Sequence, residues 1–251
     1  MTYCVALKLD AGLVLASDTR TNAGLDNISS FRKMHVWRAD DRVIVLMSAG
    51  SLSVTQDVTA SLDEAIQSAG EADEHLMNAP SMHAVGKIIG RAVRAAHDDA
   101  AQQGNTDPAV FSANFILGGQ IGSGATHLLR IYPEGNSIEA GDDTPYFQIG
   151  EHKYGKPILD RVHSSQLRLG QGAKLLLLSF DSTLRSNLSV GLPIDLMMYA
   201  DGSFEPQQVR IEESDPYFDA LSQGWSKALG DAFEKLDEFP AKKLMGRSTR
   251  H

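Results

Sequence analysis

Short apolar runs separated by turn residues occupy the start of the chain. Residues 3–9 and 13–16 form two such runs, joined by an Asp-Ala-Gly turn. After a polar loop over residues 19–30 the pattern returns, with runs over residues 31–37 and 43–48. Strand-length runs separated by turns rich in Asp and Gly are typical of β-hairpins. This part of the chain therefore predicts antiparallel sheet.

The next two segments have helical spacing instead. In residues 52–69 and 82–101 apolar side chains recur every three or four positions. In the second segment these side chains are Val85, Ile88, Ile89, Ala92, Val93 and Ala96. Such spacing places the apolar side chains on one face of a helix. We therefore expect two amphipathic helices here.

The second half of the chain repeats the alternation of strand and helix signals. Expected strands cover residues 111–121, 127–132 and 137–149, and expected helices cover 154–164 and 171–185. Two further strands, 192–199 and 209–212, precede a last helix over 217–236. This order lets two antiparallel sheets pack face to face with helices on both outer sides. The predicted fold class is α+β, a four-layer αββα sandwich.

The sequence contains no internal repeat, low-complexity stretch or Pro/Ser-rich linker that would divide it. We predict one domain over residues 1–240, followed by a basic tail over residues 241–251. The tail lacks acidic residues and carries Lys242, Lys243, Arg247, Arg250 and His251. A solvated, frayed end is the default interpretation of such a tail, and binding to an acidic groove on a neighbouring subunit is the alternative.

Charge narrows the range of partners. The 251 residues include 23 Lys and Arg against 32 Asp and Glu, a formal net charge of −9. A general affinity for nucleic acid or an anionic membrane is therefore not expected.

The longest apolar runs fall far short of the roughly 20 residues that cross a bilayer, and the first residues lack the features of a secretory signal. We predict a cytoplasmic protein that binds neither nucleic acid nor membrane.

Cysteine and histidine give no metal or redox pattern. A single cysteine, Cys4, cannot form an internal disulfide, and it lies in an apolar strand where a lone thiol is inert packing. The eight histidines show no H-E-x-x-H or comparable ligand spacing. The sequence therefore predicts neither a metal ion nor a cofactor.

Candidate chemistry begins at Thr2. A small residue after the initiator Met usually means only that the Met is removed, but removal here also exposes an α-amino group beside a hydroxyl. With a pKa of about 7.7 to 8, that amine can take the proton from the Thr2 hydroxyl. The design needs a nearby cation and a carboxylate to hold it. Two residues meet these needs: Lys33, which lies inside an expected apolar strand, and Asp18, which ends the second strand. For Lys33 the alternative is a solvated strand face.

Several spaced motifs together resemble proteasome β-subunits and the bacterial two-component protease subunit. They are Thr2 at the start, SDTR at residues 17–20, FRK at 31–33 and SAGS at 48–51. More narrowly, MTYCV at 1–5, SDTRTNAG at 17–24, FRKM at 31–34 and STLRSNLSVG at 182–191 resemble Anbu, the ancestral β-subunit family of bacteria. This resemblance covers nearly the whole chain.

The resemblance implies an activity and an assembly. In this family a threonine attacks a peptide carbonyl, a lysine tunes proton transfer, an aspartate pairs with the lysine, and a backbone N–H beside a helix start stabilises the oxyanion. On this chain the roles fall on Thr2, Lys33, Asp18 and Gly50. The implied function is a threonine hydrolase that cleaves amide bonds of a peptide or protein substrate inside a homo-oligomeric ring or helical stack. Without the resemblance, Gly50 is equally well an ordinary strand-to-helix turn.

Two elements depart from the family pattern. The usual IGSG signature reads IGEH at residues 149–152, so Glu151 stands at the serine position. The usual D-x-x-S-G element reads SNLSV at 186–190, which keeps Ser189 but has Ser186 in place of the aspartate. We hypothesise that Glu151 supplies the missing carboxylate near the Thr2 amine. The alternative is a catalytically silent assembly that binds a peptide or protein partner.

A rival motif overlaps the first of these elements. Residues 150–156, GEHKYGK, match the phosphate-binding pattern G-x-x-x-x-G-K between an expected strand and an expected helix. Pro157 follows where a Ser or Thr should bind Mg²⁺, and it also lacks an N–H for phosphate. We therefore do not expect nucleotide binding.

Overall fold

The structure is a computed structural model that describes residues 2–22, 28–70, 73–102 and 112–240. Contacts within the chain group it into two compact units, Met1–Glu213 and Ser214–His251. The single domain expected over residues 1–240 stays a prediction. The basic tail over residues 241–251 lies outside the described residues.

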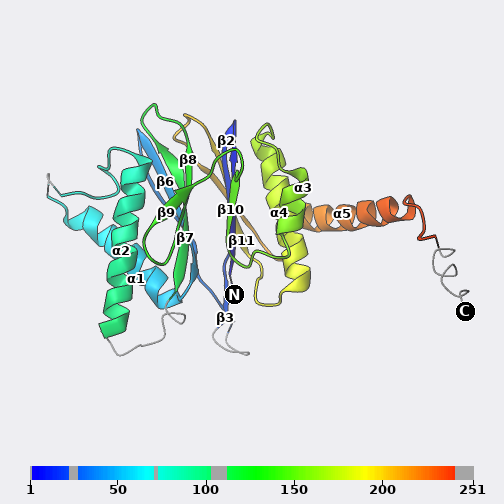
Figure 1. The fold of residues 1–251 in the computed structure, drawn as a ribbon, viewed down its shortest axis with the longest axis horizontal. Helices are drawn as coiled ribbons and strands as arrows, with labels where there is room; N and C mark the ends of the chain where they lie inside the picture. Colours follow the sequence, from blue (N-terminus) through cyan, green and yellow to red (C-terminus); the bar gives the residue numbers. More distant parts are fainter. Residues whose placement is uncertain (1, 23–27, 71–72, 103–111, 241–251) are drawn as a thin grey trace, which may run out of the picture. The chain divides into compact units, whose positions relative to one another are not determined.

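Two antiparallel sheets form the centre of the first unit (Figure 1). One sheet contains, in spatial order, β10 (Tyr146–Gly150), β1 (Tyr3–Leu9), β2 (Gly12–Asp18), β11 (Ile194–Ala200) and β12 (Gln207–Ile211). The other contains β5 (Met34–Ala39), β6 (Arg42–Gly50), β7 (Ala113–Ile121), β8 (His127–Ile131) and β9 (Ser137–Glu139). A separate pair of short strands consists of β3 (Arg20–Asn22) and β4 (Ile28–Ser30).

Helices cover both outer faces of the paired sheets. Helices α1 (Leu52–Ser68) and α2 (Met82–Gln102) lie on the β5–β9 side, and α3 (Lys156–Val162) and α4 (Leu169–Ser186) lie on the other side (Figure 1). These four layers confirm the predicted αββα sandwich. The second unit contains α5 (Pro216–Glu234), whose first turn is capped because the Asp215 side chain accepts the N–H of Phe218 at 2.8 Å.

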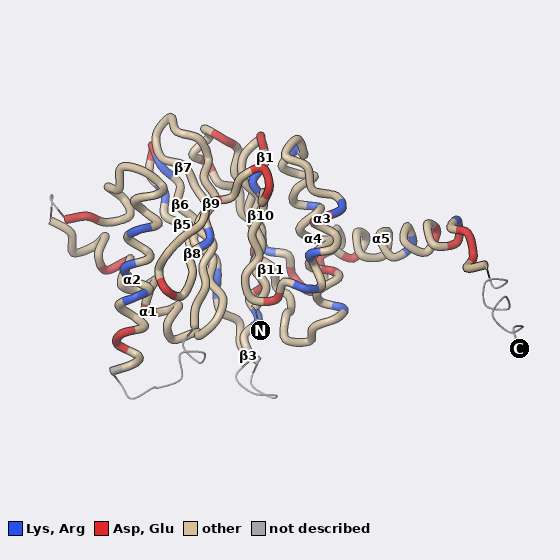
Figure 2. Tube along the Cα trace, viewed as in Figure 1, with Lys and Arg blue, Asp and Glu red and all other residues tan. Residues whose placement is uncertain are grey.

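Burial on two faces explains the nearly continuous apolar character of β1, β2 and β6. Alternate residues of β6 point into different cores: Val45 lies in the core between the sheets, whereas Leu46 lies in the core under α1 and α2. Positions of Lys and Arg and positions of Asp and Glu are interspersed along the chain of the first unit (Figure 2). Among the described residues, no helix is long and apolar enough to cross a membrane.

Three sequence predictions of element boundaries were wrong. The strand expected over residues 137–149 is two strands in different sheets, β9 and β10, because the polar turn that contains Asp142, Asp143 and Pro145 redirects the chain. The loop expected over residues 19–30 contains β3 and β4. The strand expected from residue 31 begins at Met34, which leaves Lys33 in the segment before β5.

Candidate functional site

Sheet pairing brings the predicted residues at the start of the chain to one edge of the sandwich. In the register of β1 with β2, Cys4 lies opposite Ser17, which places Tyr3 beside Asp18 at the end of β2. The backbone N–H of Tyr3 donates to Asp18 Oδ1 at 3.0 Å. Thr2, directly before β1, is therefore held next to Asp18 through the backbone of its neighbour.

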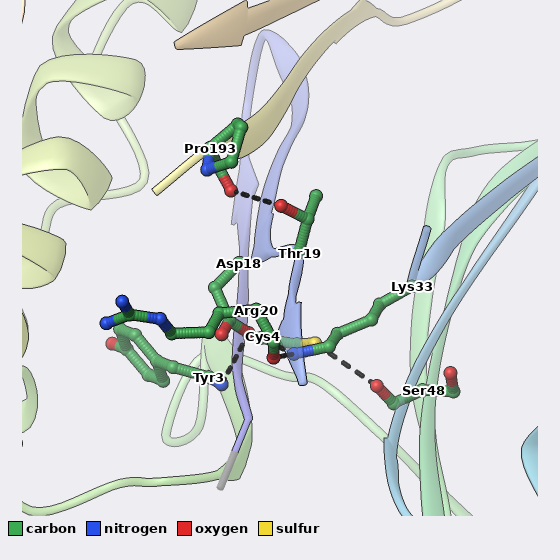
Figure 3. Close-up of polar contacts among 8 residues, drawn as sticks. All are labelled: Tyr3, Cys4, Asp18, Thr19, Arg20, Lys33, Ser48 and Pro193. Carbon is green, nitrogen blue, oxygen red and sulfur yellow. Dashed lines mark hydrogen bonds and ion pairs between the residues drawn. The ribbon is translucent and has the colours of Figure 1, made fainter. Parts of the chain in front are cut away.

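Lys33 reaches this carboxylate from the segment just before β5. Figure 3 shows its side chain pointing toward Asp18 and Arg20. The Lys33 ammonium donates to Asp18 Oδ1 at 2.8 Å and to the carbonyl oxygen of Arg20 at 2.6 Å. The side chains of Lys33 and Asp18 are only 6% and 0% exposed, so the solvated-face alternative for Lys33 is wrong.

The electrostatics of Asp18 reflect its burial. Loss of water raises the pKa of the Asp18 carboxyl, and the charge and hydrogen bond of Lys33 oppose that rise. The backbone N–H groups of Tyr3 and Gly191 oppose it as well. A buried carboxylate that depends on one ammonium and two amides is sensitive to the loss of any of them.

Two glycines shape the backbone around Thr2. Gly50 ends β6 with φ +123°, and a Cβ there would lie 2.1 Å from the carbonyl oxygen of Ser112. Gly150 ends β10 with φ +77°, and a Cβ there would lie 2.0 Å from the carbonyl oxygen of Thr2. Only glycine fits such close approaches at positive φ. Gly150 therefore allows the first residues to lie against β10, where the N–H of Glu151 also donates to the Thr2 carbonyl at 2.7 Å.

A cavity of about 260 Å³ opens beside these residues. Its lining includes Thr2, Thr21, Lys33, His35 and Gly50. Gly50 is exposed and is followed closely by the start of α1, as its predicted role requires. A larger cavity of about 890 Å³ adjoins it, because Ala49 and Gly50 line both.

Glu151 lies next to Thr2 in the backbone, but its side chain has other partners. Its Oε1 accepts the N–H groups of His152 and Lys153, each at 2.8 Å, and its Oε2 accepts the Asn187 amide at 2.8 Å. Burial alone would raise the pKa of Glu151, but these hydrogen bonds bring it below its ordinary value. Asn187 Oδ1 in turn accepts the N–H of Ser189 at 2.9 Å. The carboxylate thus fastens the loop after α4, which contains the predicted Ser189, to the end of β10.

The same contacts argue against the phosphate-binding interpretation of residues 150–156. In such a loop the backbone N–H groups point at phosphate, whereas here the N–H groups of His152 and Lys153 bind the buried Glu151 carboxylate. A phosphate, as a second anion, would be repelled by this carboxylate. The glycine at 155 has a packing reason, since a Cβ would lie 2.2 Å from the Ser179 hydroxyl.

Cys4 behaves as packing, in agreement with the sequence interpretation. It is fully buried and its thiol donates to the Ser48 carbonyl at 3.4 Å. Burial raises the pKa of the thiol strongly, with an opposing effect from Lys33, so the thiolate needed for nucleophilic attack is disfavoured.

Sequence reasoning missed several members of the site. The Tyr3 amide and the Arg20 carbonyl act through the backbone, which carries no residue-type signal. Asn187 lies inside the altered SNLSV element, next to Ser186, and it pairs with Glu151 of the altered IGEH element. That both elements depart from the family pattern was the one available hint that they contact each other.

Comparison with known proteins places this geometry in a family. The family model described as Proteasome subunit matches residues 2–196. None of the curated proteins matches the chain.

Solved structures give strong similarity over almost the full length. Anbu from Hyphomicrobium sp. strain MC1 is 52% identical, with a TM-score of 0.87, over 95% of this chain and 99% of that one. Anbu from Yersinia bercovieri is 46% identical, with a TM-score of 0.88, over 95% and 98%. The helical assembly of the Anbu complex from Pseudomonas aeruginosa contains a chain 43% identical, with a TM-score of 0.89, over 96% and 99%. This chain therefore belongs to the proteasome family and, within it, to the Anbu or ancestral β-subunit proteins.

Proposed function

We propose that this chain is a threonine hydrolase that cleaves peptide or amide bonds with Thr2 as its nucleophile after Met1 is removed. The observation that carries the proposal is the buried contact between Lys33 and Asp18 beside Thr2, at the wall of a cavity. A buried ion pair is weak evidence for stability, because apolar side chains of similar volume often stabilise a fold as well. A chemical role accounts for it better.

The proposed reaction uses groups of this chain alone. The Thr2 α-amine takes the hydroxyl proton, the Thr2 oxygen attacks the substrate carbonyl, and the oxyanion forms near the backbone of Gly50. The amine then protonates the leaving nitrogen, and water hydrolyses the ester on Thr2. Lys33 favours the deprotonated forms of nearby groups through its charge, and Asp18 holds it in place.

The two adjoining cavities suit an extended substrate. The cavity of about 260 Å³ is the size of a side-chain pocket, and the one of about 890 Å³ can take several residues of a chain. Their shared wall at Ala49 and Gly50 lies where the scissile bond would sit. We propose that a peptide passes over this wall.

We propose that Glu151 is a positioning residue for this reaction. Its carboxylate orders Asn187 and, through it, the Ser189 loop that the family places near the threonine amine. Glu151→Ala should therefore remove turnover and leave assembly intact, whereas Glu151→Gln should keep part of the turnover because one oxygen can still accept hydrogen bonds. Unchanged turnover in Glu151→Ala would refute this role.

We further propose that the chains form a homo-oligomer, in line with the Pseudomonas aeruginosa relative described as a helical assembly. A silent assembly that binds a peptide or protein partner is the second candidate. In favour of this candidate, both Glu151 oxygens accept hydrogen bonds from groups other than the Thr2 amine.

A degradation assay separates the two candidates. Wild type, Thr2→Ala and Thr2→Ser would be incubated with a mixed peptide library and the products identified by mass spectrometry. We expect new cleavage products from wild type and, more slowly, from Thr2→Ser, and none from Thr2→Ala. Equal products from Thr2→Ala would exclude Thr2 as the nucleophile, and assembled wild type without products would favour the silent assembly.

A further inference from the structure

Two histidines and a glutamate from three different elements meet at the β9 edge of the sandwich. His83 lies in the first turn of α2, His127 begins β8 and Glu139 ends β9. The His127 Nδ1 atom lies 2.6 Å from Glu139 Oε1, and the His83 Nε2 atom lies 3.1 Å from Glu139 Oε2. One nitrogen of each histidine and one oxygen of the glutamate all lie within 4.8 Å of one another.

The backbone holds these three residues in place. Leu129 of β8 lies opposite Glu139 of β9, so His127, two residues from Leu129, projects from the same face as Glu139. Helix α2 is fixed against the same hairpin at Gly90, where a Cβ would lie 2.1 Å from the carbonyl oxygen of Gly135. The fold therefore brings the backbone positions of the three residues together.

The chemistry of the cluster is that of a site for a borderline divalent cation. Two neutral imidazoles with one carboxylate and open positions for water are typical of zinc, with metal–ligand distances of about 2.0 to 2.2 Å. Magnesium and calcium prefer oxygen ligands throughout. The rings of His83 and His127 are nearly perpendicular, at 78° with centroids 5.3 Å apart, so they do not stack and their nitrogens converge on Glu139.

A nearby positive charge opposes the binding of a cation at this place. The Lys8 ammonium lies 3.9 Å from Glu139 Oε1. A metal ion at this place would therefore compete with Lys8 for the carboxylate.

We propose that His83, His127 and Glu139 bind one zinc-class divalent cation. The ion would fasten α2 to β9, a three-residue edge strand whose residues are all exposed. The place is separate from Thr2. His127 pairs with Gly119, and Gly119 lies six residue steps along β7, roughly 20 Å of strand, from Ala113, the partner of Gly50. The proposal does not depend on any hydrolase activity.

Metal titration tests the proposal on the full, untagged chain after treatment with a chelator. We expect one equivalent of Zn²⁺ by calorimetry, and one equivalent of Co²⁺ with the visible absorption of a site of low coordination number. The double variant His83→Ala/His127→Ala should bind at least about 100-fold more weakly, while the control His75→Ala should bind like wild type. Circular dichroism would check that each variant is folded.

A further variant separates a metal site from a simple ion-pair cluster. Lys8→Gln removes the competing ammonium and should tighten Zn²⁺ binding by about tenfold. The proposal is overturned if wild type binds no ion at millimolar concentration, if the double variant binds as well as wild type, or if Lys8→Gln weakens binding.

Discussion

At the scale of single residues, the Asp18 carboxylate is the group that links Lys33 to the backbone beside Thr2. It accepts from the Lys33 ammonium and from the Tyr3 backbone, and it is fully buried. Its partners come from β1 and from the segment before β5, so one buried charge couples the position of Thr2 to that of the lysine. Stability and proposed catalysis therefore both depend on this contact, and substitutions can separate them.

Lys33→Met should abolish turnover and destabilise the fold. Removal of the ammonium leaves Asp18 as an unpaired buried charge, which costs about 3 to 5 kcal/mol. Because burial raises the pKa of Asp18, the cost should shrink as the pH falls and the carboxyl takes up a proton. Denaturant unfolding at several pH values measures this.

The double variant Asp18→Asn/Lys33→Met is the matched control. It removes both charges, so most of the lost stability should return while turnover stays at least about 100-fold below wild type. Recovery of turnover together with stability would contradict a chemical role for Lys33.

Gly150→Ala should remove turnover without unfolding the sandwich. The new Cβ would clash with the Thr2 carbonyl and displace the nucleophile, and a shift of about 1 Å can cost about 100-fold in rate. Gly202→Ala is the control, because Gly202 has a similar φ of +72° but open space around its Cβ. It should lose only about 1 to 2 kcal/mol of stability from backbone strain. Equal turnover in the two variants would rule out the proposed close approach.

At the scale of elements, the contact from β10 to the loop after α4 is the part that distinguishes this chain from the family pattern. Glu151 follows β10 and stands at one departure from the usual motifs, and Asn187 follows α4, directly after the other departure at Ser186. A carboxylate and an amide thus connect two elements that are far apart in the sequence.

The pH dependence of stability should report on this connection. The pKa of Glu151 lies below its ordinary value of 4.5, so its contribution to stability is present above that value and is lost as the pH falls through the lower, folded-state pKa. Glu151→Gln should therefore be less stable than wild type near neutral pH, with a smaller difference in acid. Urea unfolding across this range measures it, with Glu205→Gln, whose side chain is 78% exposed, as the unchanged control.

The strands and helices were largely predictable, because burial imposes a period of two or 3.6 on the apolar residues. The break between β9 and β10 was not, since a run of β-forming residues does not reveal that the chain changes sheets. Lys33, Asp18 and Gly50 were proposed as site residues from motif spacing, and that proposal stays a prediction. The contacts of Tyr3, Arg20 and Asn187 were not, because they depend on backbone register, and His83, His127 and Glu139 are too far apart in sequence to form a spacing motif.

At the scale of the whole molecule, the proposed oligomer needs apolar surface to bury. Within the second unit, helix α5 presents such surface, because Leu229 and Phe233, four residues apart on one face, are 51% and 74% exposed. We propose that a second copy of this chain covers them in the assembly.

Leu229→Glu/Phe233→Glu should therefore reduce the particle mass toward that of one 27.2 kDa chain. Mass photometry at several concentrations measures this, and Gln223→Glu, on an already polar and exposed position of α5, should keep the wild-type mass. A wild-type particle mass in the double variant would show that this face of α5 does not hold copies together.

The most direct test of the proposed nucleophile is intact-mass analysis of the purified chain after treatment with an electrophilic probe for N-terminal threonine. We predict loss of Met1 and a single adduct that maps to Thr2, with no adduct in Thr2→Ala and a strongly slowed adduct in Lys33→Met. Retained Met1 without any adduct, or an adduct that persists in Thr2→Ala, would contradict the proposal that Thr2 is the nucleophile of a hydrolase.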